Sequence, residues 1–253
     1  MTFLSKQLAV KVPAVTAFFW IIKVLATTVG ETFSDFINET LGFGLGNTTA
    51  VMTVLLVVLL WFQVGSKVYR PWLYWVSIVQ VSITGTLITD NLTDGIGFPL
   101  LYSMIIFGAL LAITFVIWYR KEKSLAMKSI NTRERELFYW LAILLTFAMG
   151  TATGDYLGDA LSLGFALSAV IFAAAIGLTA ILWRSKFISE IAAFWVVYIL
   201  TRPLGASIGD LLAQAPTDGG LGVGTTGTSI IFLMAIVASV SYLAISKRDQ
   251  LKA

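Results

Sequence analysis

The sequence contains no cysteine and no histidine, and few of its residues carry a charge. Without those two side chains there is no thiol chemistry, no disulfide, no imidazole proton shuttle and no soft-metal ligand, which excludes a zinc hydrolase. Charged residues make up 12% of the chain and hydrophobic residues 58%, whereas globular domains are about a quarter charged. Because a soluble domain of this length needs a more polar surface, the composition predicts an integral membrane protein.

Eight apolar stretches can each cross roughly 30 Å of hydrocarbon at about 1.5 Å per residue. They are 12–36, 49–65, 71–90, 98–119, 136–157, 162–183, 187–212 and 227–246. Fifteen of the 17 Lys and Arg residues lie in alternate loops or at the termini, and the positive-inside rule therefore predicts that both termini are cytoplasmic. The other two, Lys23 and Arg202, lie inside predicted spans. A formal net charge of +3 is too small to indicate a nucleic-acid partner.

Four tryptophans mark an internal repeat, and repeat positions are counted here from each of them. The tryptophans are Trp20, Trp75, Trp140 and Trp195; the +10 glycines are Gly30, Gly85, Gly150 and Gly205; the +15 aspartates are Asp35, Asp90, Asp155 and Asp210. This spacing predicts four repeats, near 11–66, 67–122, 131–185 and 186–247, in one membrane domain over 1–253. Each repeat holds two spans, so all four share one orientation and are parallel repeats. The +10 glycines would let first helices cross closely.

Positions +3, +7, +11, +15 and +19 share one face of the first helix in each repeat, and we call this face the polar stripe. Its ionisable residues are Lys23, Glu31, Asp35, Glu39, Asp90, Asp94, Asp155, Asp159, Arg202 and Asp210. At +19 the fourth repeat departs from the pattern with Gln214. Because ionisable residues inside a span face the bundle interior or a water-filled cavity, the four stripes predict an acidic vestibule that opens outward. Glu31 should lie deepest and the +19 carboxylates nearest the mouth.

The stripe holds eight carboxylates and two cations, so either some carboxylates are protonated or cations occupy the site. Oxygen ligands without His or Cys suit hard cations such as Mg²⁺, Ca²⁺, Mn²⁺, Na⁺ or H⁺. The candidate ion ligands are Glu31, Asp35, Asp90, Asp155 and Asp210, and no other cofactor is expected. Lys23 and Arg202 should point inward and pair with carboxylates, since an unpaired cation at that depth costs at least several kcal/mol.

Other interpretations of the same residues stay open. The +19 carboxylates, Asp94 and Asp159 above all, can be N-caps of the following helices, and the +15 aspartates can hold the repeats together by hydrogen bonds. The tryptophans fit packing or interfacial anchoring better than ligand contact. The segments 154–159 and 207–210 approach the G-x-G-D motif of intramembrane aspartyl proteases, but neither has a glycine two residues before its Gly-Asp. An enzyme is therefore not expected.

The order of Trp, Gly at +10 and Asp at +15, repeated along nearly the whole chain, resembles a bacterial membrane-protein family built from four tandem two-helix repeats of unknown function. The resemblance implies eight helices in a bacterial inner membrane and implies no activity. From the residues themselves we expect a transporter or permeation pathway for a small cation, either inorganic or an organic cation held by cation–π contacts. The alternative is a non-transporting scaffold or cation sensor. The bilayer is the expected partner, and a homo-oligomer remains open.

Overall fold

The computed structural model describes residues 10–250, and within them the chain is helical with no strand. The α-helices are α1 (Ala17–Asp35), α2 (Leu45–Gly65), α3 (Pro71–Asp90), α4 (Leu100–Glu122), α5 (Arg133–Asp155), α6 (Gly164–Arg184), α7 (Glu190–Ala213) and α8 (Thr225–Ser246). Two short 3₁₀ turns are Met127–Ser129 and Pro216–Asp218. Every one of these α-helices is long and apolar enough to cross a membrane, which confirms the prediction of eight spans.

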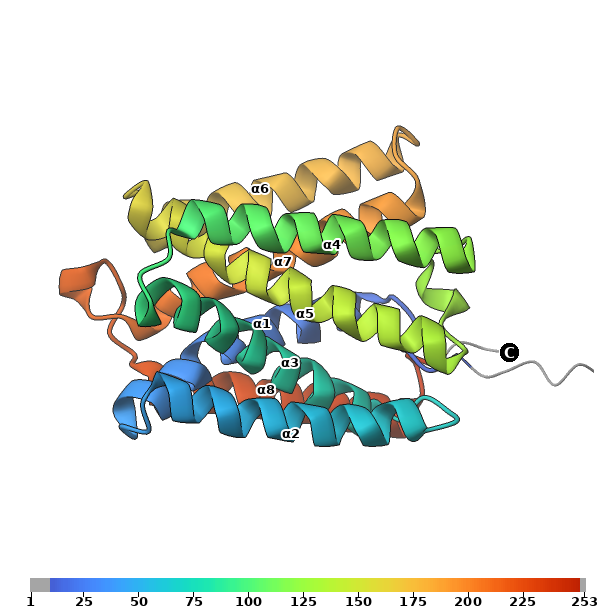
Figure 1. Ribbon diagram of the computed structural model, residues 1–253, viewed down its shortest axis with the longest axis horizontal. Helices are drawn as coiled ribbons and strands as arrows, with labels where there is room; N and C mark the ends of the chain where they lie inside the picture. Colours follow the sequence, from blue (N-terminus) through green and yellow to red (C-terminus); the bar gives the residue numbers. More distant parts are fainter. Residues whose placement is uncertain (1–9, 251–253) are drawn as a thin grey trace, which may run out of the picture.

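The first helices of the four repeats form a closed inner ring. Helix α1 packs on α3, α3 on α5, α5 on α7, and α7 returns to α1. The second helices lie outside this ring, each against the first helix of the following repeat: α2 on α3, α4 on α5, α6 on α7, and α8 back on α1 (Figure 1). Each repeat therefore buries its apolar face against its neighbour, and the fourth repeat closes the circle.

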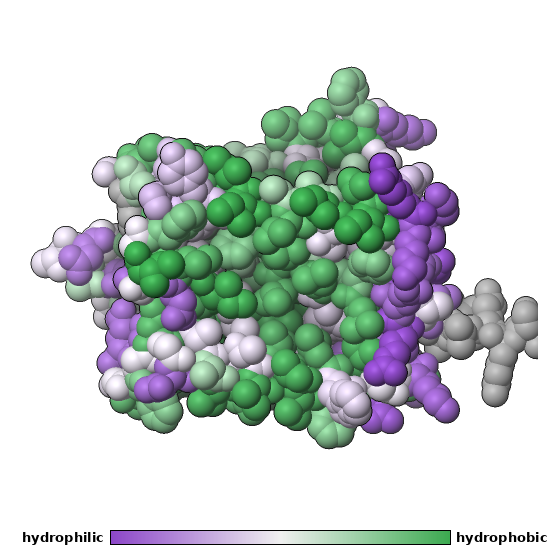
Figure 2. Space-filling view, in the orientation of Figure 1, coloured by the Kyte–Doolittle hydropathy of each residue, from purple (hydrophilic) through white to green (hydrophobic). Residues whose placement is uncertain are grey.

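The inner and outer helices differ in burial as the stripe predicts. In the most apolar stretch of α3, 72% of the residues are buried, compared with 22% in α2 and in α4. Apolar side chains cover the middle of the molecule, and hydrophilic ones gather at its two ends (Figure 2). The first helices therefore line the centre, and the second helices present the surface that a bilayer would contact.

The +10 glycines are the crossing points of the inner ring. A Cβ atom added to Gly85 would lie 2.5 Å from the Cβ atom of Phe147, and one added to Gly205 would lie 2.6 Å from that of Thr27. The same relation holds for Gly30 with Ser82 and for Gly150 with Arg202. All four partners are the +7 residues of the next repeat around the ring. No larger residue fits these positions without moving a neighbouring helix.

Both ends of the described chain lie at the same end of the bundle, where the backbone N–H of Ala14 donates to the carbonyl oxygen of Asp249 at 2.7 Å. We call this the basic end; it carries the loops 66–70, 123–132 and 185–189. The opposite, acidic end carries the loops that follow the +15 aspartates. Which end faces the cytoplasm stays a prediction.

Three of the four repeat tryptophans are buried in an aromatic cluster toward the basic end, and Trp20 is partly buried beside it. The indole N–H of Trp195 donates to the carbonyl of Leu125 at 3.0 Å, and the Trp75 ring packs edge-on against Tyr74. Their role is therefore in packing, as expected, and they lie away from the polar end of the stripe.

Candidate functional site

In the first three repeats the inner helix widens into a π-helical turn immediately after the +15 aspartate. Asp35, Asp90 and Asp155 end their α-helices, and the turns are Phe36–Thr40, Asn91–Gly95 and Tyr156–Ala160. Helix α7 has no such turn and ends at Ala213. Turns of this kind are rare and occur often at functional sites. The fourth repeat therefore departs from the pattern in backbone as well as in residue at +19.

These turns rule out the N-cap interpretation of the +19 carboxylates. The N-cap residues of α2, α4 and α6 are Gly44, Pro99 and Leu163, so this alternative interpretation is wrong for Asp94 and Asp159. The extra π turn places each +19 residue before the loop instead of at the start of the next helix. Only the backbone of Asp159 belongs to the described part of the structure.

A cavity of about 180 Å³ opens at the acidic end, and all four repeats line it. Its lining residues are Glu31, Asp35, Asn38, Glu39, Asp90, Asp94, Asp155, Phe165, Asp210 and Gln214. Glu39 and Asp94 are exposed, the +15 aspartates are partly buried, and Glu31 is buried. We call this the acidic cavity. Glu39 and Asp94 form its mouth, and Glu31 forms its floor. Asn38 and Phe165 lie off the stripe, and the sequence pattern did not indicate them.

The Arg202 side chain, which is completely buried, closes the floor of the acidic cavity. Its guanidinium donates to Glu31 Oε2 at 2.7 Å and to Thr151 Oγ1 at 2.6 Å, and it also donates to the Thr86 hydroxyl. These three acceptors are the +11 residues of the first three repeats, and the fourth +11 residue is the small Ala206. The charge-assisted hydrogen bonds of this one guanidinium therefore link all four inner helices. The prediction that Arg202 pairs with a stripe carboxylate is confirmed.

The same prediction is wrong for Lys23. Its Nζ atom has no hydrogen-bond partner among residues 10–250 and lies 4.1 Å from the ring centroid of Phe147 and 4.3 Å from that of Tyr198. Glu31, two turns along the same helix, is already bound by Arg202. The third repeat offers a phenyl ring at +7 where an oxygen would be needed, so Lys23 is held by cation–π contacts.

The acidic cavity holds many more acidic groups than basic ones. Seven carboxylates line it, and against the single guanidinium of Arg202 they leave a formal excess of six charges when all are ionised. Within the described residues, however, no three acidic side chains are arranged to hold a metal ion. The candidate ligands Glu31, Asp35, Asp90, Asp155 and Asp210 therefore line one cavity without forming a compact metal centre.

A second buried carboxylate lies at the basic end, and sequence reasoning missed it. Glu136 Oε2 pairs with Lys11 Nζ at 2.7 Å, and its Oε1 accepts from Gln63 Nε2 at 2.9 Å. Lys11 also donates to the carbonyl of Val64 at 2.9 Å. The sequence analysis counted Lys11 among the cations outside the spans and gave no role to Glu136, the first residue of the predicted span 136–157. Their partnership spans 125 residues, so no local pattern could reveal it.

The repeats are also found by comparison with known proteins. The family model described as Repeat of Unknown Function (DUF347) matches the chain four times, at residues 18–69, 73–124, 138–186 and 193–249. No curated protein and no solved structure matches the chain. The four-repeat organisation is therefore shown independently of the spacing of the tryptophans.

Proposed function

The chain belongs to this family of tandem membrane repeats, and we propose that it is a transporter for a small hard cation that binds in the acidic cavity. The observation that carries the proposal is the convergence of seven carboxylates from four repeats on one cavity whose floor is a buried arginine. These carboxylates far outnumber the one cation beside them, and this imbalance of acidic and basic groups favours an ion from solution as a partner.

Arg202 supplies a competitor for the transported ion. A cation that approaches Glu31 attracts the carboxylate to which Arg202 donates, so binding can release the guanidinium. Because that guanidinium also contacts Thr86 and Thr151, its release would loosen all four inner helices together. Lys23 and Arg202 both lie near the Phe147 ring, with Lys23 Nζ 4.1 Å and Arg202 Cζ 5.8 Å from its centroid. We therefore propose coupled movement of these side chains and a transporter in preference to an open pore.

The cavity's size and geometry favour an ion that keeps part of its water. A cavity of about 180 Å³ has room for several water molecules. Mg²⁺ typically keeps several waters and binds through one or two carboxylates, which fits acidic groups spread around a cavity. Na⁺, Ca²⁺, Mn²⁺ and H⁺ are the other members of the proposed class. The proposal includes no enzymatic reaction and places the protein in a bacterial inner membrane with the cavity facing outward.

Flux measurements on purified protein in proteoliposomes test this function. Asp90→Asn keeps the shape of the side chain and removes its charge, and we expect cation binding or flux to fall about tenfold, which corresponds to roughly 1.4 kcal/mol. The same loss is expected for Asn at the other +15 positions and for Glu31→Gln. Asp218→Asn is the matched control, because Asp218 is an exposed aspartate at the acidic end outside the cavity.

Unchanged flux in all five cavity variants would refute the transporter. Folded yield in detergent should stay near that of the wild type for the four aspartate variants, so a loss of flux in these can be separated from a loss of fold. A wild-type protein that binds cations but moves none across the bilayer would instead be a sensor or scaffold.

A further inference from the structure

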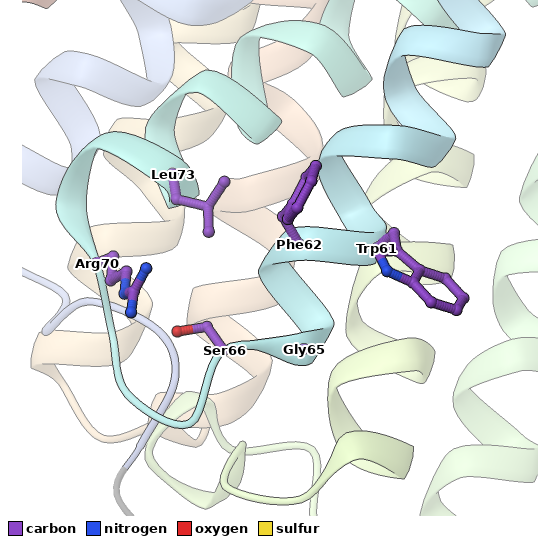
Figure 3. A pocket seen from close by; sticks show the side chains of 6 residues that line it. All are labelled: Trp61, Phe62, Gly65, Ser66, Arg70 and Leu73. Carbon is purple, nitrogen blue, oxygen red and sulfur yellow. The ribbon is translucent and has the colours of Figure 1, made fainter.

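A groove of about 270 Å³ lies at the basic end, where α2 ends and α3 begins. Its lining residues are Trp61, Phe62, Gly65, Ser66, Arg70 and Leu73 (Figure 3). Phe62 and Leu73 lie on its helical side, Arg70 and Ser66 lie on its loop side, and Trp61 points away from the loop. We call it the α2–α3 groove. It is separate from the acidic cavity, which opens at the other end of the bundle.

The apolar wall of the α2–α3 groove faces the bilayer region. Trp61 is 71% exposed and Phe62 61% exposed, and both lie on the outer helix α2. Aromatic side chains near the end of a membrane span sit at the level of the lipid headgroups. This wall therefore provides a surface for the part of an acyl chain that is nearest the headgroup.

The loop wall of the α2–α3 groove presents an unused positive charge. The Arg70 side chain is exposed and makes no ion pair or hydrogen bond with any other residue of the described chain. Helix α3 begins directly after it at Pro71, without a side-chain cap. The uncapped amides of that first turn add partial positive charge beside the guanidinium. Lys67 is a further exposed cation in the same short loop.

The corresponding junction between α6 and α7 has a different arrangement of charge. There Trp183 is 48% exposed and precedes Arg184, so an exposed Trp and a cation recur. Helix α7, however, is capped by the Ser189 hydroxyl, which accepts from the amide of Ala192 at 3.2 Å, and its first turn carries Glu190. Lys186 is a further exposed cation there, but Glu190 and the filled cap make the α6–α7 junction less favourable for an anion than the α2–α3 groove.

We propose that the α2–α3 groove binds an anionic phospholipid of the leaflet at the basic end. The phosphate would lie against the Arg70 guanidinium and the start of α3, and the acyl chains would lie along Trp61 and Phe62. The combination of an unpaired cation with an exposed aromatic wall identifies a lipid, because a soluble phosphate gains nothing from the aromatic side chains. This inference does not depend on the transport function.

Native mass spectrometry of the full chain in detergent can test it by counting retained lipid. We expect phosphatidylglycerol to bind about fivefold more tightly than phosphatidylcholine, the effect of one cation near an anionic headgroup. Arg70→Gln should abolish this preference. Arg184→Gln, which removes the same charge beside an exposed tryptophan at the same end, should leave it intact. Trp61→Ala should weaken retention of both lipids.

Three outcomes would overturn the proposal. Equal retention of the two lipids by the wild type would show that headgroup charge is not recognised. An equal loss in Arg70→Gln and Arg184→Gln would indicate a diffuse field and no site. Displacement of phosphatidylglycerol by equimolar glycerol 3-phosphate would identify a soluble anion as the ligand. If Arg70→Gln does not fold, the wild-type lipid preference and the competition with glycerol 3-phosphate still test the proposal, because neither needs the variant.

Discussion

The two ends of the bundle bury the same type of side chain in opposite ways. At the basic end the fully buried carboxylate of Glu136 is matched by Lys11, Gln63 and the indole of Trp140. At the acidic end seven carboxylates share a cavity with one buried guanidinium. The charge of Glu136 is balanced within the fold, whereas the acidic groups of the cavity outnumber the cation beside them.

This difference separates a structural acid from a candidate ligand. A buried carboxylate with a complete set of donors has no remaining need for a partner, and its removal leaves those donors unsatisfied. Carboxylates in excess around water repel one another until protons or cations join them. Substitutions at the basic end should therefore change stability, whereas those in the cavity should change ion binding.

The largest effect is expected from Lys11→Met. This change leaves Glu136 charged, unpaired and fully buried, and breaking such a pair costs about 3–5 kcal/mol in the free energy of unfolding. Thermal or denaturant unfolding in detergent measures it. The double variant Lys11→Met with Glu136→Leu should recover much of the loss, since no uncompensated charge then remains.

The control is the ion pair of Lys121 and Glu134, which also lies near the basic end but is about half exposed. Lys121→Met should cost less than about 1 kcal/mol, because solvent screens an exposed pair. Equal losses in the free energy of unfolding for Lys11→Met and Lys121→Met would contradict the proposed difference between a buried structural acid and a surface one.

A smaller loss is expected from Arg202→Met, about 2–3 kcal/mol in the free energy of unfolding. As in Lys11→Met, a buried carboxylate loses its ion-pair partner. The carboxylate of Glu31, however, borders the acidic cavity and can take up water or a proton. Adding Glu31→Gln should restore part of the stability. Unfolding and cation flux should be measured on the same preparations, because flux is expected to fall in both variants.

Lys23→Met is the matched control for Arg202→Met. Lys23 makes no hydrogen bond in the described structure, and methionine replaces its stem against the Phe147 and Tyr198 rings. Its removal leaves no carboxylate without an ion-pair partner, so the free energy of unfolding should stay within about 1 kcal/mol of that of the wild type. A loss as large as that of Arg202→Met would show that Lys23 has an ionic partner.

The smallest expected effect is a pH dependence at the basic end, outside the spans. Burial raises the pKa of Asp249 above its ordinary value, and the hydroxyl of Tyr69, which donates to this carboxylate, opposes part of the rise. Between the ordinary pKa, near 4, and the raised one, the folded protein binds more protons than the unfolded chain. Stability should therefore fall as the pH rises through this window.

Asp249→Asn should flatten that part of the curve of melting temperature against pH. A curve for Asp249→Asn that keeps the full wild-type slope just above pH 4 would mean that Asp249 does not cause it.

Much of the architecture could be predicted because its signals are local and periodic. Hydropathy marks eight spans, and the recurrence of tryptophan, glycine and aspartate marks four equivalent repeats. The +10 glycines indicated close helix crossings, and the structure has one at each of them. The stripe likewise predicted that Glu31 and the +15 aspartates would meet, because polar side chains on a span turn away from lipid.

The partners of the buried charges depended on contacts between distant segments, and no periodicity encodes them. Lys23 and Arg202 share the inner face of the ring, but Glu31 accepts only from Arg202, so Lys23 is left with two aromatic rings. Nothing in the sequence linked Lys11 with Glu136, and only the fold places them 2.7 Å apart. The π turns that carry Glu39 and Asp94 followed no residue signal that distinguishes them from an α-helical ending. Helix periodicity decides which face of a helix is polar, whereas the crossing of helices decides which atom each charge meets.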